Sequence, residues 1–209
     1  MSRSRQKPAI GMPPPDLSGF PKWRLRPSFI FTRAHGAGKS PWWFSCDLSG
    51  RFDLAAPLGT CYLANDAKTA LRERFGHDLV EQGVVTWKAA HNTQVSRLQV
   101  PAGRWLANSC HDDAAAYGAT RELGTCADYD IPQSWAAALH DHRFRGLRYQ
   151  TRFTTGPRPN AVALFDQAGV HDWPLDQQPT PGVAACRQAG LNVAQNPSRR
   201  HVTIVDPPR

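Results

Sequence analysis

Four polar side chains could do chemistry, and three of them lie in or beside predicted apolar strands. Arg33 lies at the end of the apolar run at residues 29–31, and Arg51 directly follows a glycine. Tyr62 and Thr151 lie within apolar stretches, where a buried hydroxyl costs about 1–3 kcal/mol unless it is hydrogen-bonded. Arginines of this kind suit the binding of an anion. By themselves, however, the residues favour the ordinary interpretation, in which each arginine only caps a strand at the surface. A buried threonine likewise commonly bonds a neighbouring carbonyl group.

The familiar nucleotide-binding and hydrolytic motifs are missing from the sequence. No GxGxxG, HExxH or GxSxG pattern occurs. Residues 36–40 read Gly-Ala-Gly-Lys-Ser and so end like a phosphate-binding loop, but the upstream glycine of that motif is absent. We therefore expect no phosphate loop here.

Metal binding is not predicted either. Cys110 adjoins His111, and His140 lies two positions before His142, but no second ligand pair follows at zinc spacing. The chain has five cysteines without a CxxC pair. An odd, scattered set of this kind is typical of reduced thiols in a cytosolic protein.

Composition and charge narrow the class of protein. The chain has 209 residues, of which 41% are hydrophobic and 20% charged, as expected of a globular domain with a sizeable core. No stretch approaches the roughly 20 apolar residues of a membrane span. The basic N-terminus runs into prolines at positions 13–15 without an apolar segment, so we expect a cytoplasmic protein without a secretory signal. The net charge of +8 indicates an anionic partner without naming it.

Local patterns predict the elements that must position these residues. We expect residues 1–24 to form a flexible, basic, proline-rich arm and residues 25–209 to form one domain. Within that domain, Asn65 and Asp66 are a good cap for a helix that Gly76 would end. Further helices are expected at residues 113–123 and 133–140.

Strands are predicted from short apolar runs and from alternation of apolar and polar residues. The alternation is clearest at residues 147–153, where Thr151 would share the apolar face with Tyr149. The other predicted strands are at residues 29–31, 60–64, 95–100, 161–165 and 201–205. Because strands and helices do not alternate regularly, the sequence predicts an α+β domain with short mixed sheets and flanking helices.

Two groups of motifs resemble the RES-domain family. Residues 50–53 read Gly-Arg-Phe-Asp, residues 59–64 read Gly-Thr-Cys-Tyr-Leu-Ala, and residues 69–73 read Thr-Ala-Leu-Arg-Glu. These resemble the family's Arg-Phe-(Asn/Asp), Tyr-Leu-Ala strand and Ala-Leu-x-Glu helix. Residues 133–136 (Gln-Ser-Trp-Ala) and 146–152 (Gly-Leu-Arg-Tyr-Gln-Thr-Arg) resemble its second block, Gly-(Ile/Leu)-x-Tyr-x-Ser.

The spacing of the first group supports the resemblance. Arg51 precedes Tyr62 by 11 positions, and Tyr62 precedes Glu73 by another 11, as in the family. The resemblance spans residues 29–165. It departs from the family at Thr151, where the family has serine, so that the hydroxyl is kept but a methyl group is added.

The resemblance implies a function and assigns roles. Family members resemble the ADP-ribosyltransferase fold and act on NAD as toxins that a cognate antitoxin neutralises. Glu73 would be the catalytic carboxylate, with Arg51 and Thr151 beside it, and Arg33 and Arg51 would clamp the pyrophosphate or an attacking phosphate. Tyr62 and Tyr149 would pack on the nicotinamide or ribose, and Thr151 would bond the nicotinamide carboxamide. The implied substrates are NAD and inorganic phosphate, with no metal.

The resemblance leaves the acceptor of the ADP-ribosyl group open. Water would make the protein a NAD glycohydrolase, phosphate a NAD phosphorylase and a macromolecule an ADP-ribosyltransferase. A non-catalytic or nucleic-acid-binding basic protein is another alternative, although no nucleic-acid-binding module is recognisable. A third alternative is a protein that serves only as an interaction partner of an antitoxin. For a RES toxin, nucleic acid would be met only indirectly, through the antitoxin. The sequence assigns no role to residues 1–24 or 166–200, and it predicts no oligomeric state.

Overall fold

An eight-stranded sheet forms the centre of the part of the chain that the structure describes, residues 10–156 and 160–195 of a computed structural model. Its strand order is β1-β7-β8-β9-β4-β2-β6-β11, and all neighbours are antiparallel except β7 and β8. The strands are β1 (Lys22–Leu25), β7 (Arg104–Asn108), β8 (Gly146–Tyr149), β9 (Ala161–Gln167), β4 (Leu58–Ala64), β2 (Ile30–Gly36), β6 (Thr93–Gln99) and β11 (Thr180–Pro181).

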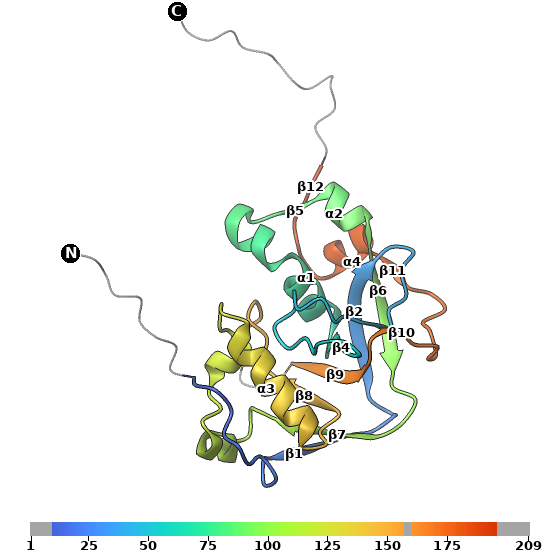
Figure 1. Cartoon of the computed structure of the whole chain (residues 1–209). Coiled ribbons are helices and arrows are strands. Elements are labelled where there is room, and N and C mark those ends of the chain that lie inside the picture. The colour runs from blue at the N-terminus through green and yellow to red at the C-terminus, as the bar shows by residue number, and fades with distance from the viewer. Residues whose placement is uncertain (1–9, 157–159, 196–209) are drawn as a thin grey trace, which may run out of the picture.

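Helices and two small strand pairs surround this sheet (Figure 1). The helices are α1 (Ala67–Gln82), α2 (Trp87–His91), α3 (Asp130–Asp141) and α4 (Gly182–Gln188), with 3-10 turns at Asp112–Tyr117 and Arg121–Gly124. The small pairs join β3 (Trp43–Phe44) to β10 (Gly169–Val170) and β5 (Val85–Thr86) to β12 (Val193–Ala194). The expected α+β class is confirmed.

Strand β9 separates two parts of the core because its side chains alternate between the two faces of the sheet. Ala161, Ala163 and Phe165 join the apolar cluster that also contains Trp135 of α3. Val162 and Leu164 join the cluster on the opposite face. A third cluster packs α1 against α2 and α4. Helix α1, which carries the predicted carboxylate, is therefore fixed between the sheet and a layer of small helices.

The start of helix α1 follows the predicted cap, but its end does not. The Asp66 side chain accepts a hydrogen bond from the Thr69 N–H at 2.8 Å, as expected of an N-cap. The helix then passes through Gly76 and ends at Gln82, with Gly83 in the left-handed conformation as its C-cap. The prediction that Gly76 ends the helix is wrong. This glycine is instead buried against the ring of Phe153, where a Cβ atom would overlap the ring.

Other predicted elements differ in extent. The alternating strand at residues 147–153 is only β8, which ends at Tyr149, so Thr151 lies in the following loop. The predicted helix at 113–123 is two 3-10 turns rather than an α-helix. The predicted strand at 201–205 lies outside the described residues. No helix in the described ranges is long and apolar enough to cross a bilayer.

The predicted boundary at residue 25 does not mark the beginning of packed structure. Ile10, Leu17 and Phe20 are buried in the cluster under α3, and β1 already pairs with β7 from Lys22 onward. The indole N–H of Trp135 also donates to the Gly11 carbonyl at 2.9 Å. Scattered apolar residues thus hold residues 10–24 against the domain, although their local composition is typical of a linker. Residues 1–9 of the predicted arm lie outside the described residues.

Candidate active site

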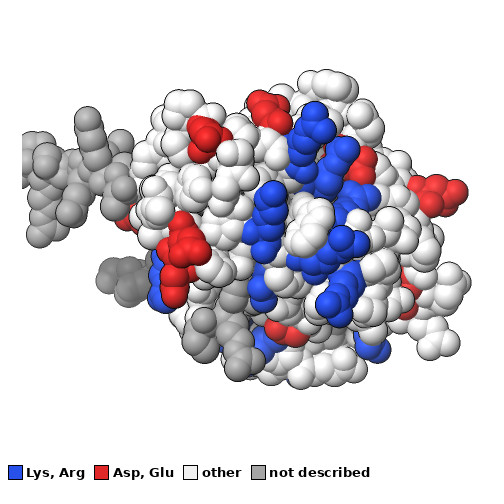
Figure 2. Space-filling model, turned by 90° about the horizontal axis from the view of Figure 1, so that it is seen from below, with Lys and Arg blue, Asp and Glu red and all other residues white. Residues whose placement is uncertain are grey.

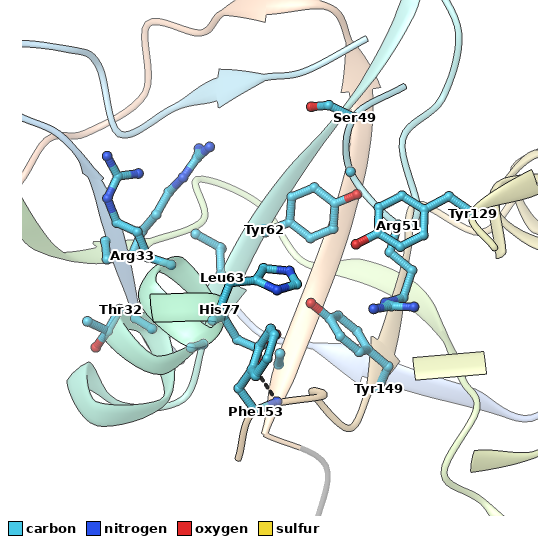
Figure 3. Close-up of a pocket in the computed structure, with 17 residues that line it drawn as sticks. Thr32, Arg33, Ser49, Arg51, Tyr62, Leu63, His77, Tyr129, Tyr149 and Phe153 are labelled. Atoms are coloured by element: carbon cyan, nitrogen blue, oxygen red, sulfur yellow. Dashed lines mark hydrogen bonds between the residues drawn. The ribbon is translucent and has the colours of Figure 1, made fainter. Parts of the chain in front are cut away.

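A cleft of about 490 Å³ opens between helix α1, the middle of β2 and the ends of β4 and β8 (Figure 3). Side chains from both predicted motif groups line it. Polar and aromatic residues on its wall are Thr32, Arg33, Ser49, Arg51, Tyr62, Glu73, Arg74, His77, Tyr129, Tyr149 and Phe153. The cleft therefore combines one carboxylate, three arginines and several aromatic rings.

Glu73 is the carboxylate of the cleft and is only partly exposed. One of its oxygens accepts a hydrogen bond from the Phe153 N–H at 2.8 Å. Burial raises the pKa of Glu73, while the Phe153 N–H, the Thr151 hydroxyl and the positive charge of Arg51 lower it by less. The loop that follows β8 thus fixes the orientation of the carboxylate, because it supplies the N–H that binds it.

Gly76 allows this loop to approach helix α1. We expect Gly76→Ala to destabilise the fold by about 1–3 kcal/mol, because the added methyl group would push Phe153 away from a packed position. The gain in helix propensity, about 1 kcal/mol for alanine over glycine, would offset only part of this. The same shift would move the Phe153 N–H away from Glu73 and reduce any activity that depends on this carboxylate.

Chemical denaturation of the wild type and the Gly76→Ala variant measures the loss directly. The double variant Gly76→Ala with Phe153→Leu serves as the control, since a smaller side chain at 153 would relieve the overlap and restore part of the stability. A Gly76→Ala protein as stable as the wild type would contradict this role of the glycine.

Thr151 lies behind the carboxylate and not on the wall of the cleft. Its side chain is 3% exposed, and its N–H donates to the Asn160 side chain at 2.9 Å. The hydroxyl makes no hydrogen bond of normal geometry, yet it is close enough to Glu73 to lower the pKa of that carboxyl group. The structure therefore brings Thr151 to Glu73.

A tight turn at residues 50–53 positions Arg51. The Gly50 N–H donates to one oxygen of Asp53 at 2.9 Å, and the Tyr62 hydroxyl donates to the other at 2.8 Å. The Tyr62 oxygen in turn accepts the Phe52 N–H at 2.8 Å. The hydroxyl of Tyr62 is thus committed to the turn, which leaves its ring to line the cleft.

Helix α3 holds the same turn from the other side. The amide of Gln133 donates to the Leu48 and Gly50 carbonyls, each at 2.9 Å. Gln133 belongs to the second predicted motif group and Gly50 to the first. This contact joins the two motif groups, which are distant in the sequence, at one site.

The Arg51 side chain reaches the part of the cleft that holds Glu73. Its guanidinium lies over the Tyr129 ring, 4.8 Å from the centroid, and donates to the Cys126 carbonyl. Its charge acts on both Glu73 and Tyr149. Arg51 therefore stands near the carboxylate but retains donors for an anion, because a guanidinium carries five N–H groups.

Arg33 and Arg74 form a second positive region. Figure 3 shows Arg33 on the far side of the cleft from Arg51. Arg33 donates to the carbonyls of Pro41 at 2.6 Å and Trp43 at 3.0 Å. Arg74 donates to the Thr93 hydroxyl at 2.9 Å, and its pKa is lowered by burial and by the nearby charge of Arg33. The two regions of positive charge suit an elongated anion lying across the cleft.

The tyrosines of the cleft provide surfaces and not bases. The ring of Tyr149 packs edge-on against Phe52, with 4.8 Å between centroids. Burial raises the pKa of Tyr149, and the pKa of Tyr62 lies well above its ordinary value for the same reason. Both hydroxyls stay protonated at neutral pH, so Glu73 is the group in the cleft that carries negative charge.

Five of the six predicted residues line the cleft, and Thr151 lies just behind it. Sequence reasoning missed Arg74, His77, Tyr129 and Phe153. His77 had a usable signal, since it lies four positions after Glu73 and therefore on the same helix face. Tyr129 lies in an irregular segment and had none. Among the described residues no group of three or more His, Cys, Asp or Glu side chains could hold a metal ion.

The α+β fold and this cleft define a protein with a carboxylate set among arginines and aromatic rings. The RES domain model matches residues 22–181, and the chain belongs to the RES domain family. No curated protein matches the sequence. A solved structure is similar: a chain of the crystal structure of the M. tuberculosis MbcT–MbcA toxin–antitoxin complex, with a TM-score of 0.57 and 15% identity. The match covers 78% of this chain and 88% of that one and supports the fold.

Proposed function

We propose that this protein consumes NAD by cleaving the bond between nicotinamide and ribose. The observation that carries the proposal is the partly buried Glu73 carboxylate, which faces a cleft with arginines on both sides. Membership of the RES domain family supports the same substrate. NAD is a dinucleotide diphosphate, so both the charge and the aromatic lining of the cleft suit it.

The chemistry needs one carboxylate and no general acid. The nicotinamide of NAD⁺ is a cationic pyridinium, so when the C–N bond breaks, its electron pair neutralises the ring and nicotinamide leaves without a proton. The ribose carbon then carries positive charge, as in other glycosyl transfers. Glu73 would stabilise that charge and bind a ribose hydroxyl, an interaction that strengthens as the bond breaks.

The other residues would bind and orient the substrate. Arg51 and Arg33 would bind the diphosphate or an attacking phosphate, since guanidinium groups bind such oxygens in pairs. Tyr62 and Tyr149 would pack against the nicotinamide or ribose. From behind the carboxylate, Thr151 would hold Glu73 in place through its hydroxyl, and a contact with the carboxamide would require it to turn toward the cleft.

The candidate functions differ only in the group that accepts the ADP-ribosyl unit. Water would yield ADP-ribose, phosphate would yield a phosphorylated ADP-ribose, and a macromolecular side chain would make the protein an ADP-ribosyltransferase. The positive charge of Arg33 and Arg74 suits either the diphosphate or a small anionic acceptor such as phosphate. We further propose that the protein is a toxin held inactive by an antitoxin, as the similarity to a chain of a toxin–antitoxin complex suggests.

Incubation of the purified protein with NAD, with and without phosphate, tests this function. We expect nicotinamide release, and the mass of the second product would identify the acceptor. Co-expression with a small protein encoded beside it should suppress both the NAD turnover and any growth arrest. Intact NAD in every condition, from folded protein free of any partner, would overturn the proposal. Unchanged turnover with the neighbouring protein would overturn only the antitoxin part.

A further inference from the structure

Basic side chains gather on one face of the molecule, away from the cleft. Figure 2 shows this face from below, where β1 and β7 lie in Figure 1. We call it the basic face; its residues come from β1, β7, β8 and the segment after α3. They are Lys22, Arg24, Arg26, Arg104, Arg143, Arg145 and Arg148. None of them lines the cleft that contains Glu73.

A groove of about 420 Å³ runs across the basic face. Arg104, Arg143 and Arg145 line it together with Trp105. The carboxylate on its wall is Asp166, which is paired with Arg104 at 2.9 Å. The charges of Arg143 and Arg145 therefore remain available to an anionic partner.

Two tryptophans contact arginines of the basic face through their rings. Trp105 is 48% exposed, and the guanidinium of Arg24 lies 5.2 Å from its ring centroid. Arg24 and Trp105 are partners in the β1–β7 register, and the Arg145 N–H donates to the Trp105 carbonyl at 2.9 Å. Arg148 similarly lies 4.5 Å from the ring centroid of Trp23. An exposed indole beside an arginine provides both a stacking surface and positive charge.

Arg143 occupies a position that normally favours glycine. It follows helix α3 with a φ of 66°, in the left-handed region, and its N–H donates to the His140 carbonyl at 2.8 Å. Glycine is the usual residue at such a helix end because it adopts this conformation without steric cost. An arginine there costs some stability relative to glycine.

We propose that the basic face binds single-stranded nucleic acid. The arginines would contact the phosphodiester backbone, and a base would stack on Trp105. A group of arginines beside an exposed tryptophan suits nucleic acid, because its phosphates repeat along the chain and each phosphate is followed by a base with a planar ring. This binding is independent of the cleft.

Fluorescence anisotropy with a labelled single-stranded oligonucleotide of about 20 nucleotides tests the proposal. We expect binding that weakens as salt rises, because phosphate contacts release counterions. The double variant Arg143→Gly with Arg145→Gln should bind about tenfold or more weakly, with a salt slope smaller by about 1 to 1.5. Trp105→Ala should also lose about tenfold. Arg143→Gly alone should fold at least as stably as the wild type, so weaker binding would not reflect unfolding.

Arg187→Gln on α4, at the other end of the molecule, is the matched control and should bind like the wild type. Nicotinamide release should be unchanged in all these variants. The proposal is overturned if the wild type does not bind, if the double variant binds within twofold of it, or if Arg187→Gln loses as much. Tighter binding of poly-glutamate than of the oligonucleotide would assign the face to an acidic protein, and tighter binding of duplex would remove the stacking role of Trp105.

Discussion

Replacing Glu73 by glutamine is expected to slow nicotinamide release by about 10²–10³-fold or more without loss of the fold. The glutamine carbonyl can still accept the hydrogen bond from the Phe153 N–H, which is 2.8 Å long in the wild type. What it lacks is the negative charge that stabilises the positive ribose carbon as the bond to nicotinamide breaks. The measurement is the initial rate of nicotinamide release from NAD by the purified variant.

Glu73→Gln should lower the activity, but it should not lower the stability of the fold. Because burial raises the pKa of Glu73, the folded protein favours the protonated carboxyl group. The ionised group therefore destabilises the fold above this raised pKa, and the cost disappears as the pH falls below the pKa of the unfolded chain. Glu73→Gln should accordingly be as stable as the wild type or more stable at neutral pH, with the difference vanishing in acid. The activity of the wild type should fall in the same acidic range.

Glu81→Gln is the matched control, since Glu81 is an exposed residue of the same helix that does not line the cleft. It should change neither the rate of nicotinamide release nor the midpoint of unfolding. Release by Glu73→Gln at the rate of the wild type would show that this carboxylate does not take part in the reaction.

Arg51→Lys should lower kcat/KM for NAD by about 10²-fold although the charge is kept. A lysine cannot cover the Tyr129 ring, donate to the Cys126 carbonyl and offer two parallel N–H groups to an anion at once. We expect most of the loss in kcat, because Arg51 acts beside Glu73, where charge changes during the reaction. Steady-state kinetics with NAD as the varied substrate separates kcat from KM.

Arg72→Lys provides the comparison for this substitution. Arg72 lies on α1 next to Glu73 in the sequence but outside the cleft, and its replacement should leave both constants unchanged. Equal losses in the two variants would indicate a general effect of positive charge on NAD binding. A loss confined to KM in Arg51→Lys would make Arg51 a binding residue without a role in the bond cleavage.

Local signals in the sequence account for much of the fold. The cap at Asp66 is a contact between residues three positions apart, so the chain needs no tertiary structure to specify it. The strands at 60–64 and 161–165 are mostly apolar because both faces of the central sheet are covered. Tyr62 lies on the first of these strands, and its hydroxyl holds the turn that carries Arg51. The same strand leads into α1, which carries Glu73.

Other features depend on contacts that no local pattern contains. A glycine such as Gly76 is typical of a helix end, yet it lies within α1. There the ring of Phe153, 77 positions later, packs against it. The alternation at 147–153 is that of a strand, but backbone pairing with β9 ends at Tyr149. Residues 10–24 look like a linker, and only the hydrophobic pocket beneath α3 makes Leu17 and Phe20 part of the core.

The sequence by itself determined the family resemblance, the α+β class and the identity of five residues on the wall of the cleft, since these depend on residue types at short, regular spacings. Only the tertiary structure decided how the site is assembled. It placed Gln133 against Gly50, the Phe153 N–H on Glu73, Tyr129 beneath Arg51 and Thr151 behind the carboxylate. These contacts join segments tens of residues apart, and they form because the sheet and the helices bury their apolar faces together.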